Sequence, residues 1–350
     1  MRAFAKASQY SYKMTVLTSE LRDQIIHAAD LLRKGGTVAF PTETVYGLGA
    51  DISIPSAIHQ LFKIKNRPVD HPLIVHFSNI SQLHYWAEEV PESAWQLAKH
   101  FWPGPLTLIL QRSRHIPNSV TGGQDTVGLR IPNHPVALTL LKALGSRKAL
   151  AAPSANRFGR ISPTTAAHVQ EELGQTVDMI LDGGPCQVGL ESTIVSFSDQ
   201  TAIVLRPGGV PLAALKSVLN ERVILADRNN LTVRVSGTLA SHYAPSTPLE
   251  ILSSESIWQR ALNLETQGLR VIMILCSVAN KTQSTSRNIL KFYLPQESGA
   301  YGKQLYATLR RFDHKGFDRL LVEAPPDSTA WLAINDRLQR ASYNTLNEHK

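Results

Sequence analysis

The fold class follows from the stretch TVAFPTETVYGLG at residues 37–49 and from how often its pattern recurs. Residues 37–40 are predicted to form a buried strand that ends at Pro41, because proline cannot donate a hydrogen bond to a sheet. Two threonines, a glutamate and a tyrosine then precede the glycines. Polar groups that follow a strand in an open α/β sheet lie where ligand crevices form. A plain turn rarely needs so many of them, although it remains the alternative.

Outward from this stretch, short apolar runs alternate with amphipathic ones, which is typical of an α/β protein. Further strands are predicted at residues 73–77, 106–110, 127–131, 179–181, 193–197 and 202–205, with helices at 58–64 and 136–144. The stretch 235–248 is rich in Ser, Thr, Gly and Pro, which favours a linker. Beyond it, strands are predicted at 249–252, 271–275 and 320–322, and helices at 257–264, 304–312 and 331–341.

The domain organisation predicted from this pattern has four parts. They are an N-terminal extension at 1–20, an open-sheet α/β domain at 21–211, a linker at 212–247 and a smaller Rossmann-like α/β domain at 248–350. The chain of 350 residues is long enough for two domains, each with its own core.

Composition excludes several classes of protein. Hydrophobic residues make up 43% and charged residues 18%, as in folded globular proteins. No apolar run reaches the roughly 20 residues of a membrane helix, so we expect no membrane association. The net charge of +8 permits an anionic partner, and direct contact with tRNA is left open.

Cysteine and histidine usage argues against a metal site in the protein. The two cysteines, Cys186 and Cys276, are far apart, which is against a disulfide framework and fits a reducing cytoplasm. None of the twelve histidines forms the paired pattern of a zinc protease.

The first 19 residues hold Arg2, Lys6 and Lys13 and no acid, as targeting peptides do. We favour an upstream start codon instead, with Met14 opening the protein.

Nucleotide enzymes often carry a glycine-rich phosphate loop, but neither such pattern occurs here. The run from Lys63 to Pro68 offers an alternative, since it places Lys63, Lys65 and Arg67 at a helix end that Pro68 turns into a loop. Lysine and arginine suit phosphate oxygens. A solvated basic helix end that complements the helix dipole is the alternative.

A second polar turn follows another apolar strand, at Ala151 to Asn156. Ser154 and Asn156 present small polar groups there, and Ser162-Pro163-Thr164 is predicted to cap a helix nearby. A helix N-terminus suits an anion, while ordinary turn and cap chemistry is the alternative.

Taken together, these motifs resemble the YrdC/Sua5 family of threonylcarbamoyl-AMP synthases. The family's order is followed by residues 41–49, 65–68, 101–107, 130–132, 152–156, 191–193 and 206–208. The resemblance is close over about 21–211. The linker residues 242–245 (HYAP) and the trailing α/β domain make the chain similar to the long, Sua5-type member.

The resemblance implies a twisted, open-sheet YrdC-like catalytic domain with a wide basic cleft, and it assigns roles residue by residue. Lys65 and Arg67 match the family's catalytic cations. The expected ATP contacts are Lys63, Lys65, Arg67, Thr126, Ser154, Asn156, Ser162, Arg206, His242 and Tyr243. The expected L-threonine contacts are Thr42, His71, Arg130, Ala152 and Ser192. The family's linker opens with Ser-Pro-Gly, whereas this chain has Val235-Ser236-Gly237-Thr238, and position 71 varies in the family.

The activity implied is synthesis of L-threonylcarbamoyl-adenylate and pyrophosphate from L-threonine, bicarbonate and ATP with Mg²⁺. The product serves N6-threonylcarbamoyladenosine formation at position 37 of tRNAs reading ANN codons, through a partner transferase complex in the cytoplasm. The carbamate of threonine would attack the α-phosphate, a step that needs aligned cations and no strong base. A lid around Tyr243 would protect the anhydride.

Two other functions remain as alternatives. A tRNA-binding assembly factor without catalysis would use the positive charge, but the chain lacks RRM and KH signatures. A carbamoyl-transfer enzyme like the hydrogenase-maturation proteins would need zinc-finger cysteines that this chain lacks. The role of the C-terminal domain and the oligomeric state stay open.

Overall fold

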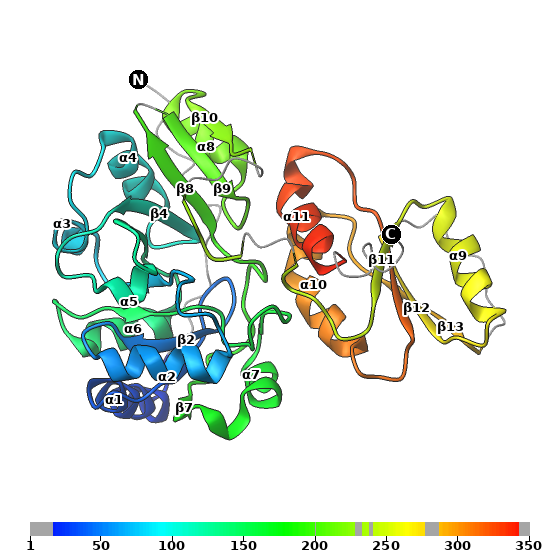
Figure 1. The fold of residues 1–350 in the computed structure, drawn as a ribbon, viewed down its shortest axis with the longest axis horizontal. Helices are drawn as coiled ribbons and strands as arrows, with labels where there is room; N and C mark the ends of the chain where they lie inside the picture. The colour runs from blue at the N-terminus through cyan, green and yellow to red at the C-terminus, as the bar shows by residue number, and fades with distance from the viewer. Residues whose placement is uncertain (1–16, 200, 228–232, 238–240, 277–286, 343–350) are drawn as a thin grey trace.

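The computed structural model forms two lobes, each built on its own sheet (Figure 1). It describes residues 17–199, 201–227, 233–237, 241–276 and 287–342. Most of the expected N-terminal extension, including Met1 and Met14, lies outside these residues, as does Thr238 of the linker. Among the described helices, none is both long and apolar enough to cross a bilayer.

The first lobe contains a mixed ten-stranded sheet in the order β10-β9-β8-β4-β5-β3-β6-β2-β1-β7. Its strands are β1 (Val38–Phe40), β2 (Gly47–Asp51), β3 (Ile74–His76), β4 (Leu106–Gln111), β5 (Thr126–Arg130), β6 (Leu150–Ala151), β7 (Met179–Ile180), β8 (Thr193–Ser198), β9 (Thr201–Arg206) and β10 (Val223–Leu225). β1 pairs antiparallel with β2, while β3 pairs parallel with β5. The large open sheet agrees with the predicted fold class.

Helices cover both faces of this sheet. They are α1 (Ser19–Arg33), α2 (Pro55–Lys65), α3 (Leu83–Trp86), α4 (Glu92–Phe101), α5 (Asn118–Thr121), α6 (Pro135–Leu144), α7 (Ala166–Glu172) and α8 (Leu212–Leu219). Side chains alternate between faces along a strand. Val38 and Phe40 accordingly pack with α1 and α6, whereas Ala39 packs into the core that includes α2 and α4.

The expected linker begins later than its predicted start at residue 212. α8 and β10 fall within that stretch, and β10 pairs parallel with β9 as the edge strand of the large sheet. Leu215, Leu219 and Val223 are buried in the main core, so burial of apolar surface holds this segment in the first lobe. The prediction of a linker was therefore wrong for 212–225.

The second lobe is a four-stranded parallel sheet, in the order β11-β14-β12-β13. Its strands are β11 (Leu249–Leu252), β12 (Val271–Leu275), β13 (Ile289–Tyr293) and β14 (Arg319–Glu323), and its helices are α9 (Ser256–Glu265), α10 (Ser298–Phe312) and α11 (Leu332–Ala341). α10 and α11 lie on the side that faces the first lobe, and α9 lies on the far side (Figure 1). The predicted strands and helices of this domain are present, and β13 was not predicted.

Candidate active site

A small pocket of about 50 Å³ lies where strand ends of the large sheet meet the linker. Buried arginines and small hydroxyl groups line much of it. The lining residues are Val45, Arg67, Ile74, His76, Arg130, Ala152, Pro153, Ser154, Glu191, Ser192, Arg206, Ser236, Gly237, His242 and Tyr243. Eight separate parts of the chain, from the loop after β1 to the linker, therefore meet around one cavity.

Eight of the fifteen residues expected to bind ligands line this pocket. They are Arg67, Arg130, Ala152, Ser154, Ser192, Arg206, His242 and Tyr243. Lys63, Lys65, Thr126, Asn156, Ser162, Thr42 and His71 do not line it.

Arg67 lies just after α2, where the chain leaves the helix at Asn66 in a left-handed conformation. Its Nη2 donates to the carbonyl of Pro72 at 2.9 Å and to the Ser236 hydroxyl at 3.0 Å. Its guanidinium also stacks over Phe158, 5.3 Å from the ring centroid. Burial lowers the pKa of Arg67 to about 10, so the side chain is still a cation at neutral pH.

Lys65 is fully buried behind the pocket instead of lining it. Its Nζ donates to the carbonyls of Ser154 and Asn156, both at 2.5 Å. Burial, with the nearby charge of Arg67, lowers the pKa of this ammonium group. Lys65 therefore ties the end of α2 to the polar turn after β6.

Arg130, at the end of β5, is held by groups from the loop that follows β1. Its Nη2 donates to Glu43 Oε1 at 2.8 Å and to Thr44 Oγ1 at 2.8 Å. Glu43 has no exposed side-chain surface, and its other oxygen accepts from the backbone of Asn133. Arg130 Nε is buried and has no hydrogen-bond partner among the described residues.

Ser192 and Arg206 also line the pocket. Arg206 Nη2 donates to the Ser192 carbonyl at 2.9 Å and to its hydroxyl at 3.2 Å. Arg206 Nη1 reaches the linker and donates to the Ser236 carbonyl at 2.8 Å. Because Arg67 contacts the hydroxyl of the same residue, two buried cations of the pocket hold Ser236 in place.

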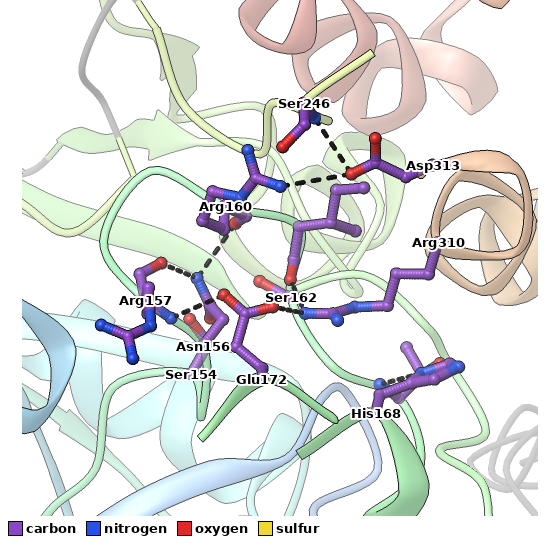
Figure 2. Close-up of polar contacts among 12 residues, drawn as sticks. Ser154, Asn156, Arg157, Arg160, Ser162, His168, Glu172, Ser246, Arg310 and Asp313 are labelled. Atoms are coloured by element: carbon purple, nitrogen blue, oxygen red, sulfur yellow. Dashed lines mark hydrogen bonds and ion pairs between the residues drawn. The ribbon is translucent and has the colours of Figure 1, made fainter. Parts of the chain in front are cut away.

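The loop 154–162 contacts both the pocket, through Ser154, and the second lobe, through Arg160 and Ile161. Figure 2 shows its polar contacts. The Asn156 amide donates to the carbonyls of Arg157 and Arg160, at 2.7 and 3.0 Å. Glu172 accepts from the Arg157 backbone and from Arg310 of α10. Both contacts brace the loop against the second lobe.

A larger cavity of about 500 Å³ lies on the outer side of the same loop, between the lobes. Its lining includes the cations Arg157, Arg160, Arg310, Arg311 and Lys315. Arg160 pairs with Asp313 at 3.3 Å, and Asp313 also accepts from the Ser246 backbone (Figure 2).

The linker lies over the pocket, and its residues His242 and Tyr243 line the pocket and are buried. The Ala244 backbone donates to the Gly159 carbonyl at 2.9 Å, and Tyr243 stacks on Tyr306 of α10 with ring centroids 5.7 Å apart. Gly237 has a φ of +77°, and a Cβ there would come within 2.2 Å of the Tyr243 hydroxyl. Only glycine fits this close approach.

We expect Gly237→Ala to raise the KM for ATP by about 10-fold, because one lost contact group is worth roughly 1–3 kcal/mol. The added methyl group would push Tyr243 or Arg206 from its position. Initial rates over a range of ATP concentrations measure the effect. Gly268→Ala is the matched control, since Gly268 also has a positive φ but no atom within 4 Å of its Cβ position. Equal KM values for the two variants would contradict the proposed fit.

The remaining expected residues lie near the pocket in different settings. The Thr42 hydroxyl donates within its own turn, to the Val45 carbonyl at 2.6 Å. His71 packs edge-on against Phe158, and Lys63 is exposed on α2. Thr126 lines a neighbouring cavity with linker residues 233–236.

Three ionisable residues of the site were not among the predicted contacts: His76 and Glu191, which line the pocket, and Glu43, which pairs with Arg130. Glu43 and Glu191 stand inside the quoted motifs, so their positions were known but not their roles. His76 lies in β3, and its burial behind Arg130 is a tertiary contact that the sequence does not signal.

Two imidazoles in the pocket predict how stability depends on pH. Burial lowers the pKa of His76 and of His242 to about 3. Between that value and the ordinary pKa of 6.5, the unfolded chain binds protons that the folded chain does not. Stability should therefore be constant above about pH 6.5 and fall below it, by about 1.4 kcal/mol per pH unit for each imidazole.

Urea unfolding at pH 7.5, 6 and 5 measures this slope. His76→Gln should reduce it, whereas His59→Gln on the exposed side of α2 should leave it unchanged. Equal stability at pH 7.5 and pH 5 would show that the imidazoles are not held neutral.

Within the described ranges, no group of three His, Cys, Asp or Glu side chains is placed to hold a metal ion. The pocket instead gathers cations and hydroxyl groups from strand ends. These features define a site for small anionic substrates, of the kind found in nucleotide-using α/β enzymes.

Comparison with known proteins identifies the family. Residues 30–208 match the Sua5/YciO/YrdC family, described under the term telomere recombination, and residues 210–342 match the C-terminal domain of threonylcarbamoyl-AMP synthase. The chain belongs to this Sua5/YrdC family.

Its relatives include full-length proteins. A threonylcarbamoyl-AMP synthase from Pyrococcus abyssi is 37% identical over 90% of this chain and 93% of its own length. A threonylcarbamoyl-AMP synthase from Bacillus subtilis is 39% identical over 91% of this chain and 93% of its own length. The crystal structure of P. abyssi Sua5 complexed with L-threonine superposes with a TM-score of 0.83 at 37% identity, covering 92% of this chain and 94% of that one.

Proposed function

We propose that this protein makes L-threonylcarbamoyl-adenylate and pyrophosphate from L-threonine, bicarbonate and ATP, for N6-threonylcarbamoyladenosine formation in tRNA. The observation that carries the proposal is the pocket, in which Arg67, Arg130 and Arg206 converge from different segments under a closed linker. The threonine complex of the P. abyssi relative supports L-threonine as the amino acid.

Threonine binding is assigned to the side of the pocket formed by Arg130, Ala152 and Ser192. Arg130 offers its unpartnered Nε to the substrate carboxylate, a charge-assisted contact. The Ser192 hydroxyl is held by a hydrogen bond with the Thr107 hydroxyl at 2.8 Å. Thr42 acts on this side by shaping the turn that carries Glu43 and Thr44.

ATP binding is assigned to the side formed by Arg67, Arg206 and Ser154, beneath His242 and Tyr243. Lys65 contributes by holding the carbonyls of Ser154 and Asn156, which fixes the turn against which the phosphates would lie. Mg²⁺ arrives with the triphosphate as part of the substrate, held by phosphate oxygens and water.

The chemistry follows from this arrangement. Bicarbonate takes up a proton and loses water to give carbon dioxide. The threonine amine adds to this carbon dioxide, loses a proton and becomes a carbamate. A carbamate oxygen then attacks the α-phosphorus of ATP, the bond to the β-phosphate oxygen breaks, and pyrophosphate leaves. Because the carbamate is already an anion, the pocket must mainly align two anions and balance the charge of the transition state.

Pyrophosphate release by the purified protein tests the function. We expect release that requires both L-threonine and bicarbonate, and none when serine or glycine replaces threonine. No release with any amino acid, combined with tRNA binding that ATP does not displace, would favour the assembly-factor alternative.

Three further assignments are also proposals. The first is that the adenylate passes to a threonylcarbamoyl transferase complex. The second is that the protein works in the cytoplasm, whose reducing conditions suit the free thiols of Cys186 and Cys276. Direct contact with tRNA is assigned to the inter-lobe cavity, where five cations gather. Gel-shift titration of unmodified tRNA against Arg157→Ala and Lys315→Ala tests this contact, which predicts weaker binding and a smaller salt dependence.

A further inference from the structure

Glu191 connects the pocket to the second lobe. It lies just before β8, lines the pocket and is 7% exposed. Its Oε1 accepts from the Ser162 hydroxyl at 2.6 Å, on the expected ATP side. Its Oε2 accepts from the Tyr306 hydroxyl at 3.0 Å and from Arg337 Nε at 2.8 Å, and both of these residues belong to the second lobe.

Arg337 on α11 is the largest fully buried side chain of the described residues. Besides Glu191, it donates to Asp336 Oδ2 at 2.5 Å and to the Pro207 carbonyl at 2.9 Å. Its guanidinium lies over the ring of Tyr243, 5.1 Å from the centroid. One side chain of the second lobe thus contacts the pocket carboxylate, the turn after β9 and the linker.

Charge explains why this contact matters for a pocket that takes anions. An unpaired carboxylate at position 191 would repel a triphosphate and a threonine carboxylate across a few ångströms of low-dielectric space. A buried carboxylate is also costly unless it is paired and hydrogen-bonded. Arg337 supplies the opposite charge, and Tyr306 and Ser162 supply the hydrogen bonds.

We propose that Arg337 and Tyr306 of the C-terminal domain are positioning residues of the active site, acting through Glu191 on Ser162 and through Tyr243 on the linker. This inference rests on the proposed function and gives the C-terminal domain a direct part in it. The second lobe neutralises the pocket carboxylate and holds the nucleotide side in its binding geometry.

The pH profile of Arg337→Met separates this role from a merely structural one. Burial raises the pKa of Glu191, but Arg337 and then Arg206 outweigh burial and lower it to about 2. The charged or titratable groups that face Glu191 are Arg337, Tyr306, Arg206, His242 and Tyr243. Without Arg337, the pKa of Glu191 should rise, and ionisation of Glu191 above that pKa should weaken ATP binding.

We expect Arg337→Met to lower kcat/KM for ATP by about 10- to 100-fold, as loss of other supporting contacts does. The ratio of wild-type to Arg337→Met kcat/KM should increase by at least about 10-fold between pH 6 and pH 8.5, which corresponds to a change of about one unit in the pKa of Glu191. Adding Glu191→Gln should restore part of the activity and remove the pH dependence, because the uncompensated charge is then gone.

Two further variants complete the test of Arg337→Met. Tyr306→Phe preserves the packed ring and should raise the KM for ATP about 3- to 10-fold, so it reports on the network even if Arg337→Met folds poorly. Arg340→Met removes a cation from the same helix that pairs with the same Asp336, at 3.1 Å, and should keep the wild-type pH profile.

The inference would be overturned if Arg337→Met and Tyr306→Phe both kept wild-type kcat/KM and the wild-type pH profile. It would also be overturned if Arg340→Met reproduced the altered profile. A wild-type protein that does not release pyrophosphate would contradict the proposed function instead, so the two failures are distinguishable.

Discussion

Arg67→Ala is expected to lower kcat/KM for threonine- and bicarbonate-dependent pyrophosphate release by about 10²- to 10³-fold, the cost of losing one preorganised donor. Arg67 is a pocket cation on the nucleotide side that also contacts the linker, through the Ser236 hydroxyl. Its removal takes away a charge that would balance the departing pyrophosphate, and it also loosens the linker over the pocket.

Initial rates of pyrophosphate release at saturating threonine and bicarbonate measure this effect. Arg22→Ala, which removes an exposed arginine from α1, is the matched control and should behave as wild type. Arg67→Lys should recover only part of the activity, because lysine cannot reach two acceptors with a planar fork. A rate within threefold of wild type for Arg67→Ala would remove Arg67 from the site.

Arg130→Met is expected to have the second-largest effect, on both stability and threonine use. It leaves Glu43 buried without its partner, and breaking such a pair costs about 3–5 kcal/mol. It also removes the donor assigned to the threonine carboxylate, which should raise the KM for threonine by about 100-fold.

The double variant Glu43→Gln/Arg130→Met separates these two effects. Removing both charges should recover most of the unfolding free energy, measured in urea, because no buried charge is left unpaired. The KM for threonine should stay high. If the double variant regained normal threonine use, Arg130 would serve only to hold Glu43, and the assignment of the threonine side would be wrong.

Much of the fold could be predicted from local pattern. Apolar runs such as 106–110 and 271–275 became the buried strands β4 and β12. Weaker patterns were missed. β2 has the sequence GLGAD, whose glycines favour a turn in isolation, and it becomes a strand only because β1 and β6 pair with it. β13 is an edge strand with partly exposed residues, so its apolar pattern is diluted.

The site was predictable where a motif carries its own chemistry. Arg67 and Ser154 were selected from the residue types of their own motifs, and Arg206 from the resemblance to the family; all three line the pocket. Lys65 was placed in the right region, but its burial beneath two carbonyls depends on a turn about ninety residues away. The partners of Glu191 lie 115 and 146 residues further along the chain, so no local pattern could have indicated them.

The shared carboxylate also has an evolutionary consequence. A protein that lost its second domain would keep Glu191 without Arg337. The unpaired carboxylate of Glu191 would then repel the anionic substrates. On the proposed role of Arg337, we expect single-domain relatives to carry either an uncharged residue or another partner for the carboxylate where this chain has Glu191. The 2.8 Å ion pair between Glu191 and Arg337 thus links the residue required at one position of the first lobe to the presence of the second lobe.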